Sequence, residues 1–389
     1  MPTWDNMTPG IYRELVREVP DAVLRTGSPV FLGVMSNRSN LGSEPIHLYR
    51  WSQFQQSVDV VLDGGYLADT VRGFFDNGGR HCVILPAKAP VHTAQELSEQ
   101  HVFDCIRPLL PSIETLEESD LLCVPDLMLA ARQGASAEDL IAFQLDLVAH
   151  AHRAGSHFSI LDIPHFASVV ESEVIADARQ YCESLYEAIR NQNASWLRDV
   201  AVYFPWIRTS RPQSSSRFIP CSGHVAGVYA RTDAQHGVFR APAGMALEDV
   251  CDLGINLDRS SQIQLMDIGL NGIRAFRGRG IRLWGARTLS RTDPWRFISV
   301  RRLFRTIARW IELRLADIAL EPNNPLTWNR VHREVGAYLS DLHAQGALKG
   351  AVATEAFYVK GSVDQSAEIR ALGGHLSLQA PDYRSGFRM

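Results

Sequence analysis

The feature that most constrains the fold is a regular alternation of apolar runs and helical patterns through the first 210 residues. The apolar runs have the length of buried strands: PVFLGVM (29–35), HCVILPA (81–87), DLLCVPDL (120–127), HFSILDI (157–163) and DVAVYFPW (199–206). Segments with helical periodicity lie between them, at 52–58, 66–79, 94–110, 137–155 and 174–190. Strands separated by helices of this length form a parallel sheet with helices on both faces. The sequence therefore predicts a doubly wound α/β domain over residues 27–215.

A change of composition after this region predicts a second domain, because 389 residues are too many for one ordinary core. The Ser/Pro/Arg-rich stretch 208–218 interrupts the alternation and is typical of a linker or an exposed loop. Short apolar runs bounded by glycine follow, as in strands and tight turns: 227–230, 263–269 and 280–286. Two long helices come next, at 299–318 and 327–346. We expect an α+β domain over residues 222–363.

Both ends of the chain are predicted to be extended arms, over residues 1–26 and 364–389. Three prolines in the first 20 residues argue against a continuous N-terminal helix. The C-terminal segment has a short apolar alternation that ends at a proline. Neither a signal peptide nor a membrane-spanning run is predicted, so direct membrane insertion is not expected.

Basic residues gather in one part of the chain. Between Gly272 and Arg314 there are twelve arginines and only two carboxylates, with aromatic residues interleaved. The chain as a whole has 36 arginines and three lysines, which explains the choice of arginine but not the local lack of acids. Arginine pairs with carboxylates through two hydrogen bonds and stacks on aromatic rings. Such a mixture suits a surface that binds another macromolecule.

An acidic stretch balances this basic one. From Glu96 to Asp139 there are ten carboxylates and two arginines, and the formal net charge of the chain is −4. Opposed charges on one molecule favour head-to-tail association of copies, although such runs are often only solvated faces. In the predicted helix 299–318 the apolar positions form one stripe: Val300, Leu303, Phe304, Ile307 and Ile311. Arg302, Arg305 and Arg309 lie on another face of that helix.

Motifs for catalysis or for cofactor binding are not found in the sequence. No glycine-rich dinucleotide motif follows the first predicted strand, and there is no P-loop. His150 and His152 are two apart on a predicted helix and cannot share a metal ion. Asp126 and Asp162 end predicted strands, where they could be catalytic carboxylates but fit equally well as turn or helix-cap residues. We expect no enzymatic activity, no cofactor and no metal site.

From Gly223 onward the sequence resembles the contractile tail sheath family of phage tails and phage-derived injection systems. The matching segments follow the family order: GHVAGVYARTDAQHGVFRAPAG (223–244), NGIRAFRGRGIRLWGARTLS (271–290), WRFISVRRLF (295–304), ALEPNNPLTWNRV (319–331) and GALKGAVATEAFYVK (346–360). TPGIYRELV (8–16) is similar to the extended N-terminal arm of the family. The resemblance carries structural roles onto a set of motif residues: Pro242, Gly278, Gly280, Trp284, Gly285, Arg287, Glu321, Pro322 and Asn323.

The resemblance implies a structural subunit that polymerises as stacked hexameric rings around an inner tube. Contraction of such a sheath drives the tube through a target envelope, and baseplate proteins, terminal cap proteins and sheath paralogues are the further partners implied. Assembly in the bacterial cytoplasm is implied as well, with release where the particle is an injection system. The family's α/β domain lies outside and its C-terminal domain lies inward. Four arginines are therefore candidates for the tube interface, or else for a neighbouring subunit: Arg301, Arg302, Arg305 and Arg309.

The family also joins its subunits through arms that add strands to a sheet of a neighbouring copy. The candidate residues for this exchange are Gly10, Ile11, Tyr12, Leu376, Leu378 and Phe387. An arginine-rich nucleic-acid-binding protein is the alternative function, since arginines interleaved with aromatics can follow a phosphate backbone and stack on bases. The negative net charge argues against it, so nucleic acid is not an expected partner.

Overall fold

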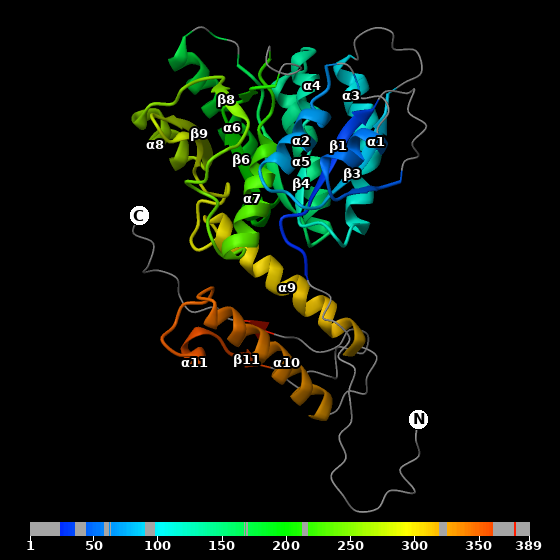
Figure 1. The fold of residues 1–389 in the computed structure, drawn as a ribbon, viewed down its shortest axis with the longest axis vertical. Helices are drawn as coiled ribbons and strands as arrows, with labels where there is room; N and C mark the ends of the chain where they lie inside the picture. The colour runs from blue at the N-terminus through cyan, green and yellow to red at the C-terminus, as the bar shows by residue number, and fades with distance from the viewer. Residues whose placement is uncertain are drawn as a thin grey trace, which may run out of the picture.

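A computed structural model describes the chain outside its two ends and several loops. The described residues are 24–35, 44–57, 62, 64–89, 98–166, 168, 170–211, 217–318, 325–360 and 377–378. Figure 1 shows a large α/β lobe at the top, a small helical lobe below it, and the long helix α9 leading from one to the other. We use "large lobe" for the described residues before α9 and "small lobe" for those after it. None of the helices in these ranges is long and apolar enough to cross a bilayer.

The large lobe is built on an eight-stranded mixed sheet with the order β10-β9-β6-β5-β4-β1-β3-β2. The strands are β1 (Pro29–Met35), β2 (Ile46–Leu48), β3 (Cys82–Lys88), β4 (Leu121–Cys123), β5 (Phe158–Asp162), β6 (Val200–Phe204), β9 (Leu270–Phe276) and β10 (Gly280–Trp284). The six strands from β3 to β9 run parallel, whereas the edge strands β2 and β10 are antiparallel to their neighbours. The predicted parallel sheet is confirmed. Apolar runs such as β1 and β6 are buried along their whole length, as in strands that helices cover on both sides.

Two groups of helices cover the sheet. The first group is α1 (Trp51–Ser57), α2 (Leu67–Asp76) and α7 (Ser222–His236), and the second is α3 (Glu99–Ile106), α4 (Leu127–Arg132), α5 (Ala137–Arg153) and α6 (Glu171–Asn193). Members of each group pack on one another, and α2 and α3 both contact β1. The connections from β1 to β3 and from β3 to β4 cross the sheet in opposite directions. Because such crossovers are right-handed, α2 and α3 lie on opposite faces.

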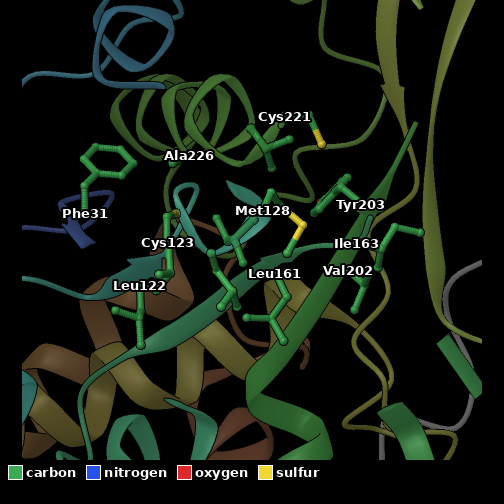
Figure 2. Packing of buried hydrophobic residues seen from close by; sticks show 14 of the residues in the cluster. Phe31, Leu122, Cys123, Met128, Leu161, Ile163, Val202, Tyr203, Cys221 and Ala226 are labelled. Atoms are coloured by element: carbon green, nitrogen blue, oxygen red, sulfur yellow. The ribbon is translucent and has the colours of Figure 1, made fainter. Parts of the chain in front are cut away.

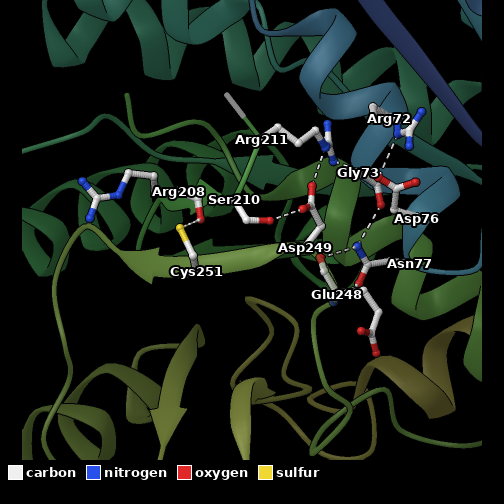
Figure 3. Close-up of polar contacts among 10 residues, drawn as sticks. All are labelled: Arg72, Gly73, Asp76, Asn77, Arg208, Ser210, Arg211, Glu248, Asp249 and Cys251. Atoms are coloured by element: carbon white, nitrogen blue, oxygen red, sulfur yellow. Dashed lines mark hydrogen bonds and ion pairs between the residues drawn. The ribbon is translucent and has the colours of Figure 1, made fainter. Parts of the chain in front are cut away.

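Three shorter elements and a pair of strands complete the large lobe. They are the 3₁₀ helices η2 (Arg107–Thr115) and η3 (Ala194–Asp199), helix α8 (Arg259–Asp267), and the antiparallel strands β7 (Ile207–Thr209) and β8 (Val250–Leu253). Figure 3 shows how Arg211, just after β7, and the turn before β8 contact the C-terminal end of α2. The side chain of Asn77 binds the backbone N–H and carbonyl of Glu248, and Arg211 pairs with both Asp76 and Asp249.

The core of the large lobe does not stop at the predicted domain boundary. Its buried cluster runs from Val30 to Ile298, and Figure 2 shows Ala226 of α7 beside residues of the central strands. β9 extends the sheet by pairing in parallel with β6, where Leu270 lies opposite Val202. The boundary predicted at 215–222 therefore differs from the observed packing, in which the two buried clusters divide near the start of α9.

Two of the glycine-bounded runs after residue 222 are helices rather than strands. The run 227–230 lies in α7, and 263–269 lies largely in α8; only 280–286 contains a strand, β10. The glycines of α7 serve close packing. A Cβ on Gly223 would lie 2.3 Å from the Thr70 carbonyl oxygen, and one on Gly227 would lie 2.5 Å from that of Phe74. Glycine here lets α7 approach the backbone of α2, which sequence composition alone does not distinguish from a turn.

Helix α9 (Ile298–Ile318) leads to the small lobe, which contains α10 (Pro325–Ala344), α11 (Ala353–Ala356), β11 (Val359–Lys360) and β12 (Ser377–Leu378). The two predicted long helices are confirmed. A second buried cluster joins them: Val238, Leu303, Ile307, Ile311, Val331, Val335, Leu339, Leu342, Leu348 and Ala356. Trp310 and Tyr338 stack with their ring centroids 3.9 Å apart. The small lobe therefore packs on α9 through apolar side chains.

Candidate functional site: the junction between helix α9 and the large lobe

The edge of the sheet at which the parallel strands begin carries a row of buried polar residues. Ser28, His81, Asp120, His157 and Asp199 directly precede β1, β3, β4, β5 and β6. All five residues are at most 7% exposed. Parallel strands place their amino ends at one edge, so residues far apart in the chain gather there. Helix α9 packs against this edge.

Arg302 occupies the centre of the junction and is 3% exposed. Its Nη1 and Nη2 donate to the two carboxylate oxygens of Asp233 in α7, at 2.9 and 2.6 Å. Nη2 also donates to Asp120 at 2.9 Å, and the guanidinium lies over the ring of Tyr229. Burial alone would lower the pKa of Arg302, but the two carboxylates outweigh it and raise that pKa. The guanidinium therefore stays charged inside the protein.

Arg301 and Arg305 converge on a second carboxylate, that of Asp199. Arg301 donates to both oxygens, with Nη2 at 3.0 Å from Oδ2, and Arg305 Nε lies 2.7 Å from Oδ1. Arg305 Nη1 also donates to the carbonyl of Gly155 at 2.6 Å. Burial raises the pKa of Asp199, but hydrogen bonds and charge from Arg305 and Arg301 outweigh it and hold the pKa below its ordinary value. Asp199 is thus an anion shared by two guanidinium groups.

Arg309 binds backbone carbonyls rather than carboxylates. Its Nη2 donates to the Glu117 carbonyl at 2.8 Å, and its Nη1 lies 3.4 Å from the carbonyl of Arg25. Burial lowers the pKa of Arg309. This side chain joins α9 to the segment by which the chain enters β1 and to the loop that precedes β4.

The prediction that these four arginines form a free face towards an inner tube is wrong for the described subunit. All four bind acceptors of the same chain, and Arg302, Arg305 and Arg309 are at most 6% exposed. Helical periodicity identifies a second face but does not say whether protein or solvent covers it. Sequence reasoning missed the partners Asp120, Asp199 and Asp233. The available signal was that Asp120 and Asp199 each directly precede a buried strand and so share an edge of the sheet.

Most of the remaining arginines in this basic stretch also bind within the chain. Among the described contacts, at least nine of the twelve between Gly272 and Arg314 donate to a carboxylate or a carbonyl of the same subunit. Arg291, for example, pairs with Glu183, and Arg282 donates to the carbonyl of Gly244. This use of the guanidinium groups gives no support to the alternative of a nucleic-acid-binding surface.

The motif glycines of the β9–β10 hairpin are explained by backbone conformation and by close packing. Gly278 and Gly280 take positive φ values of 72° and 74° in the tight turn, a region that favours glycine. A Cβ on Gly285 would lie 2.7 Å from the side-chain oxygen of Asn271. That buried Asn271 accepts from the N–H of Arg287 and donates to the carbonyls of Arg287 and Val202. Asn271 thus holds the hairpin to β6.

Of the other predicted residues, the structure describes three: Trp284, Pro242 and Leu378. Trp284 is 40% exposed and packs on Phe276 with centroids 4.6 Å apart, and Pro242 is buried. Leu378 lies in β12, paired with Val359 of β11. The remaining predicted residues lie outside the described part of the chain: Gly10, Ile11, Tyr12, Glu321, Pro322, Asn323, Leu376 and Phe387.

The opposite edge of the sheet, at which doubly wound enzymes bind ligands, is occupied by internal helix caps. Asp126 accepts from the N–H groups of Tyr66 and Leu67 at the start of α2, and from that of Val34. Asp162 accepts from two N–H groups at the start of α7, each at 3.0 Å. Burial raises the pKa of both carboxyl groups to about 6. The helix-cap interpretation of these aspartates is confirmed.

Comparisons with known proteins agree with this arrangement of two lobes. The family model for the phage tail sheath protein central domain matches residues 162–289, and that for the phage tail sheath C-terminal domain matches residues 290–370. The tail sheath protein of Vibrio phage KVP40 is 29% identical over 137 residues, which are 34% of this chain and 20% of that protein. The chain thus spans about a fifth of the length of that relative.

Two solved structures are similar over nearly the whole chain. A chain of the anti-feeding prophage baseplate, seen by cryo-EM, has a TM-score of 0.71 and 26% identity, with 99% of this chain and 98% of that chain covered. A chain of the PVC sheath complex, from an extracellular contractile injection system in its contracted state, has a TM-score of 0.68 and 24% identity, with 99% and 97% covered. The two family models together match more than half of the residues, and the chain belongs to the phage tail sheath family. Its role is therefore structural, and the predicted mixed α/β fold class is confirmed.

Proposed function

We propose that this chain is the subunit of a contractile sheath that polymerises as stacked hexameric rings around an inner tube. Contraction of the sheath drives the tube through a target envelope. The particle is a phage tail or a phage-tail-like injection system, assembled in the bacterial cytoplasm. Its other partners are the tube protein, the baseplate proteins, a terminal cap protein and any sheath paralogues.

The observation that carries this proposal is similarity over both lobes to chains of contractile assemblies. The similar chain of the anti-feeding prophage baseplate is matched over 98% of its length, so the likeness is not confined to one domain. Contraction of the sheath does not require a site that binds and hydrolyses a nucleotide. A sheath assembled in a metastable lattice can contract by forming more contacts between subunits, with a small gain per copy repeated along the particle.

The pair of short strands in the small lobe supports linkage of the copies by strand exchange. β11 and β12 form a two-stranded antiparallel sheet, with Val359 opposite Leu378. So small a sheet is marginal alone, and its outer edges offer backbone groups to further strands. Arms from neighbouring copies would extend this sheet through main-chain hydrogen bonds. The N-terminal arm with Gly10, Ile11 and Tyr12 is the proposed donor.

The experiment is expression of the full chain together with the tube and baseplate proteins of the same particle. Negative-stain electron microscopy should then show sheathed tubes of uniform width. Sheathless tubes in the presence of abundant soluble chain would contradict the proposal.

Truncations test the strand exchange separately. Deletion of residues 1–18, or of every residue after Gly374, should leave a folded core that cannot polymerise. Circular dichroism of each purified truncated chain checks the fold, and microscopy checks assembly. Long sheaths built from either truncated chain would rule out strand exchange as the linkage.

A further inference from the structure

Three possible metal ligands meet at the sheet edge that carries the junction. His47 lies in β2, His81 directly precedes β3, and Glu118 lies in the loop before β4. His47 Nδ1 is 3.4 Å from His81 Nε2 and 3.6 Å from Glu118 Oε2, and His81 Nε2 is 3.9 Å from the same carboxylate oxygen. The three ligand atoms therefore form a triangle with one atom from each segment. Their distance apart in the sequence explains why no ligand-spacing motif reveals them.

The size of this triangle matches the coordination shell of a small divalent ion. Bonds of about 2.0–2.1 Å from tetrahedral zinc to nitrogen or oxygen place neighbouring ligand atoms roughly 3.3–3.5 Å apart. The two distances from His47 are within 0.3 Å of that range. The third requires a small movement of Glu118, whose side chain is 59% exposed and can shift. Hydrogen bonding explains the cluster less well, since a 3.9 Å separation is too long for such a bond.

The surroundings of His81 hold its ring in the orientation of a ligand. Its Nδ1 lies 3.3 Å from the Ser28 hydroxyl, which leaves Nε2 directed at His47 and Glu118. Metal-binding histidines usually have such a partner on the other ring nitrogen.

We propose that His47, His81 and Glu118 bind a divalent transition-metal ion, with Zn²⁺ as the best match. Two imidazoles and a carboxylate are a ligand set that this ion prefers. The side chains of His47 and Glu118 are 41% and 59% exposed, so a fourth coordination position faces solvent, where water completes the shell.

The position of this site gives the ion a structural consequence. Glu117 accepts from Arg309 through its carbonyl, and Asp120 pairs with Arg302. Glu118, between them in the sequence, is a proposed ligand. Ser28, which contacts His81, also donates its backbone N–H to Asp120 at 2.7 Å. An ion at this place would therefore fix β2, β3 and the loop on which α9 packs.

The test uses the purified full chain and zinc chloride, with binding followed by isothermal titration calorimetry. The chain should bind one Zn²⁺, and Co²⁺ in its place should give the visible absorption of a tetrahedral site. His47→Ala and Glu118→Gln alter exposed side chains, and each should weaken binding by at least about 100-fold. His150→Ala is the matched control because His150 and Glu114 pair at 2.7 Å, and the described residues place no third possible ligand beside them.

The outcomes separate clearly. Loss of binding in both ligand variants, with unchanged binding in His150→Ala and unchanged circular dichroism, supports the site. No binding by the unaltered chain overturns the proposal. Full-strength binding by His47→Ala or by Glu118→Gln also overturns it, because the ion would then lie elsewhere. None of these results depends on sheath assembly, so failure here leaves the proposed function intact.

Discussion

The two faces of α9 hold the helix by different means. Towards the large lobe it presents Arg301, Arg302, Arg305 and Arg309, which bind carboxylates and carbonyls. Towards the small lobe it presents Leu303, Ile307 and Ile311, which pack in an apolar cluster with α10. Hydrogen bonds to guanidinium groups require a defined geometry, whereas apolar contacts do not depend on direction. The first face therefore fixes the angle of α9, and the second lets the small lobe adjust its packing.

The two faces also differ in what happens when they are disturbed. Removal of one member of a buried ion pair leaves an uncompensated charge in the interior, which is strongly unfavourable. Removal of an apolar side chain leaves a cavity that neighbours fill in part. The junction with the large lobe should consequently break in an all-or-none manner, and the contact with the small lobe should weaken gradually.

The largest effect is expected for Arg302→Leu. This change leaves Asp120 and Asp233 buried without their cation, and the free energy of unfolding should fall by about 3–5 kcal/mol. Urea unfolding at pH 7, followed by circular dichroism, measures the loss. Addition of Asp233→Asn to the variant should restore part of the stability, because it removes one unpaired charge. A loss of less than about 1 kcal/mol would mean that water reaches the junction.

A smaller effect is expected on the apolar face, for Ile307→Ala. Removal of a buried isoleucine side chain should cost about 2–4 kcal/mol. Hydrogen exchange should report the loss mainly in the amides of α10, with those of β1 and β5 little changed. Equal loss of protection in both lobes would show that they unfold as one unit, and the comparison between the faces would then fail.

Acid should act on the charged face alone. The folded-state pKa of Asp199 is lowered, so its contribution to stability is present above the ordinary pKa near 4 and is lost as the pH falls through the folded-state value. Asp199→Asn should therefore destabilise the chain at pH 7 and progressively less towards pH 2. Urea unfolding across this range gives the difference from the unaltered chain. The matching difference for Ile307→Ala should not change with pH, and a constant difference for Asp199→Asn would refute the assignment.

The smallest effect is expected for Arg291→Ala, in the loop before α9. Arg291 pairs with Glu183 at the surface, where both side chains are more than 30% exposed. Such pairs contribute about 0–1 kcal/mol. Thermal unfolding should shift little, and high salt should remove what shift there is. A loss as large as that of Arg302→Leu would show that exposure does not separate the two kinds of arginine.

These contrasts also mark how far the sequence can predict the molecule. Periodicity identified the apolar stripe of α9. Leu303, Ile307 and Ile311 are spaced so that they lie on one face of a helix, and that face is buried. The same periodicity could not assign the arginine face, since Asp120 and Asp233 reach Arg302 only through the topology of the sheet. The run that begins at Gly227 was predicted as a strand rather than a helix for a related reason. The role of Gly227 depends on the distance to α2, which no local pattern contains.

Because α9 is long, a small change of its angle at the arginine junction would move its far end by several ångströms. Its 21 residues make a rod roughly 30 Å long, and guanidinium groups hold its first half, from Arg301 to Arg309. A tilt of about 10° about the first turn would displace the far end by roughly 5 Å, one turn of helix. A shift of a single carboxylate beside Arg302 would thus be magnified along the helix. The small lobe packs on the same helix, so small changes at the sheet edge would move it.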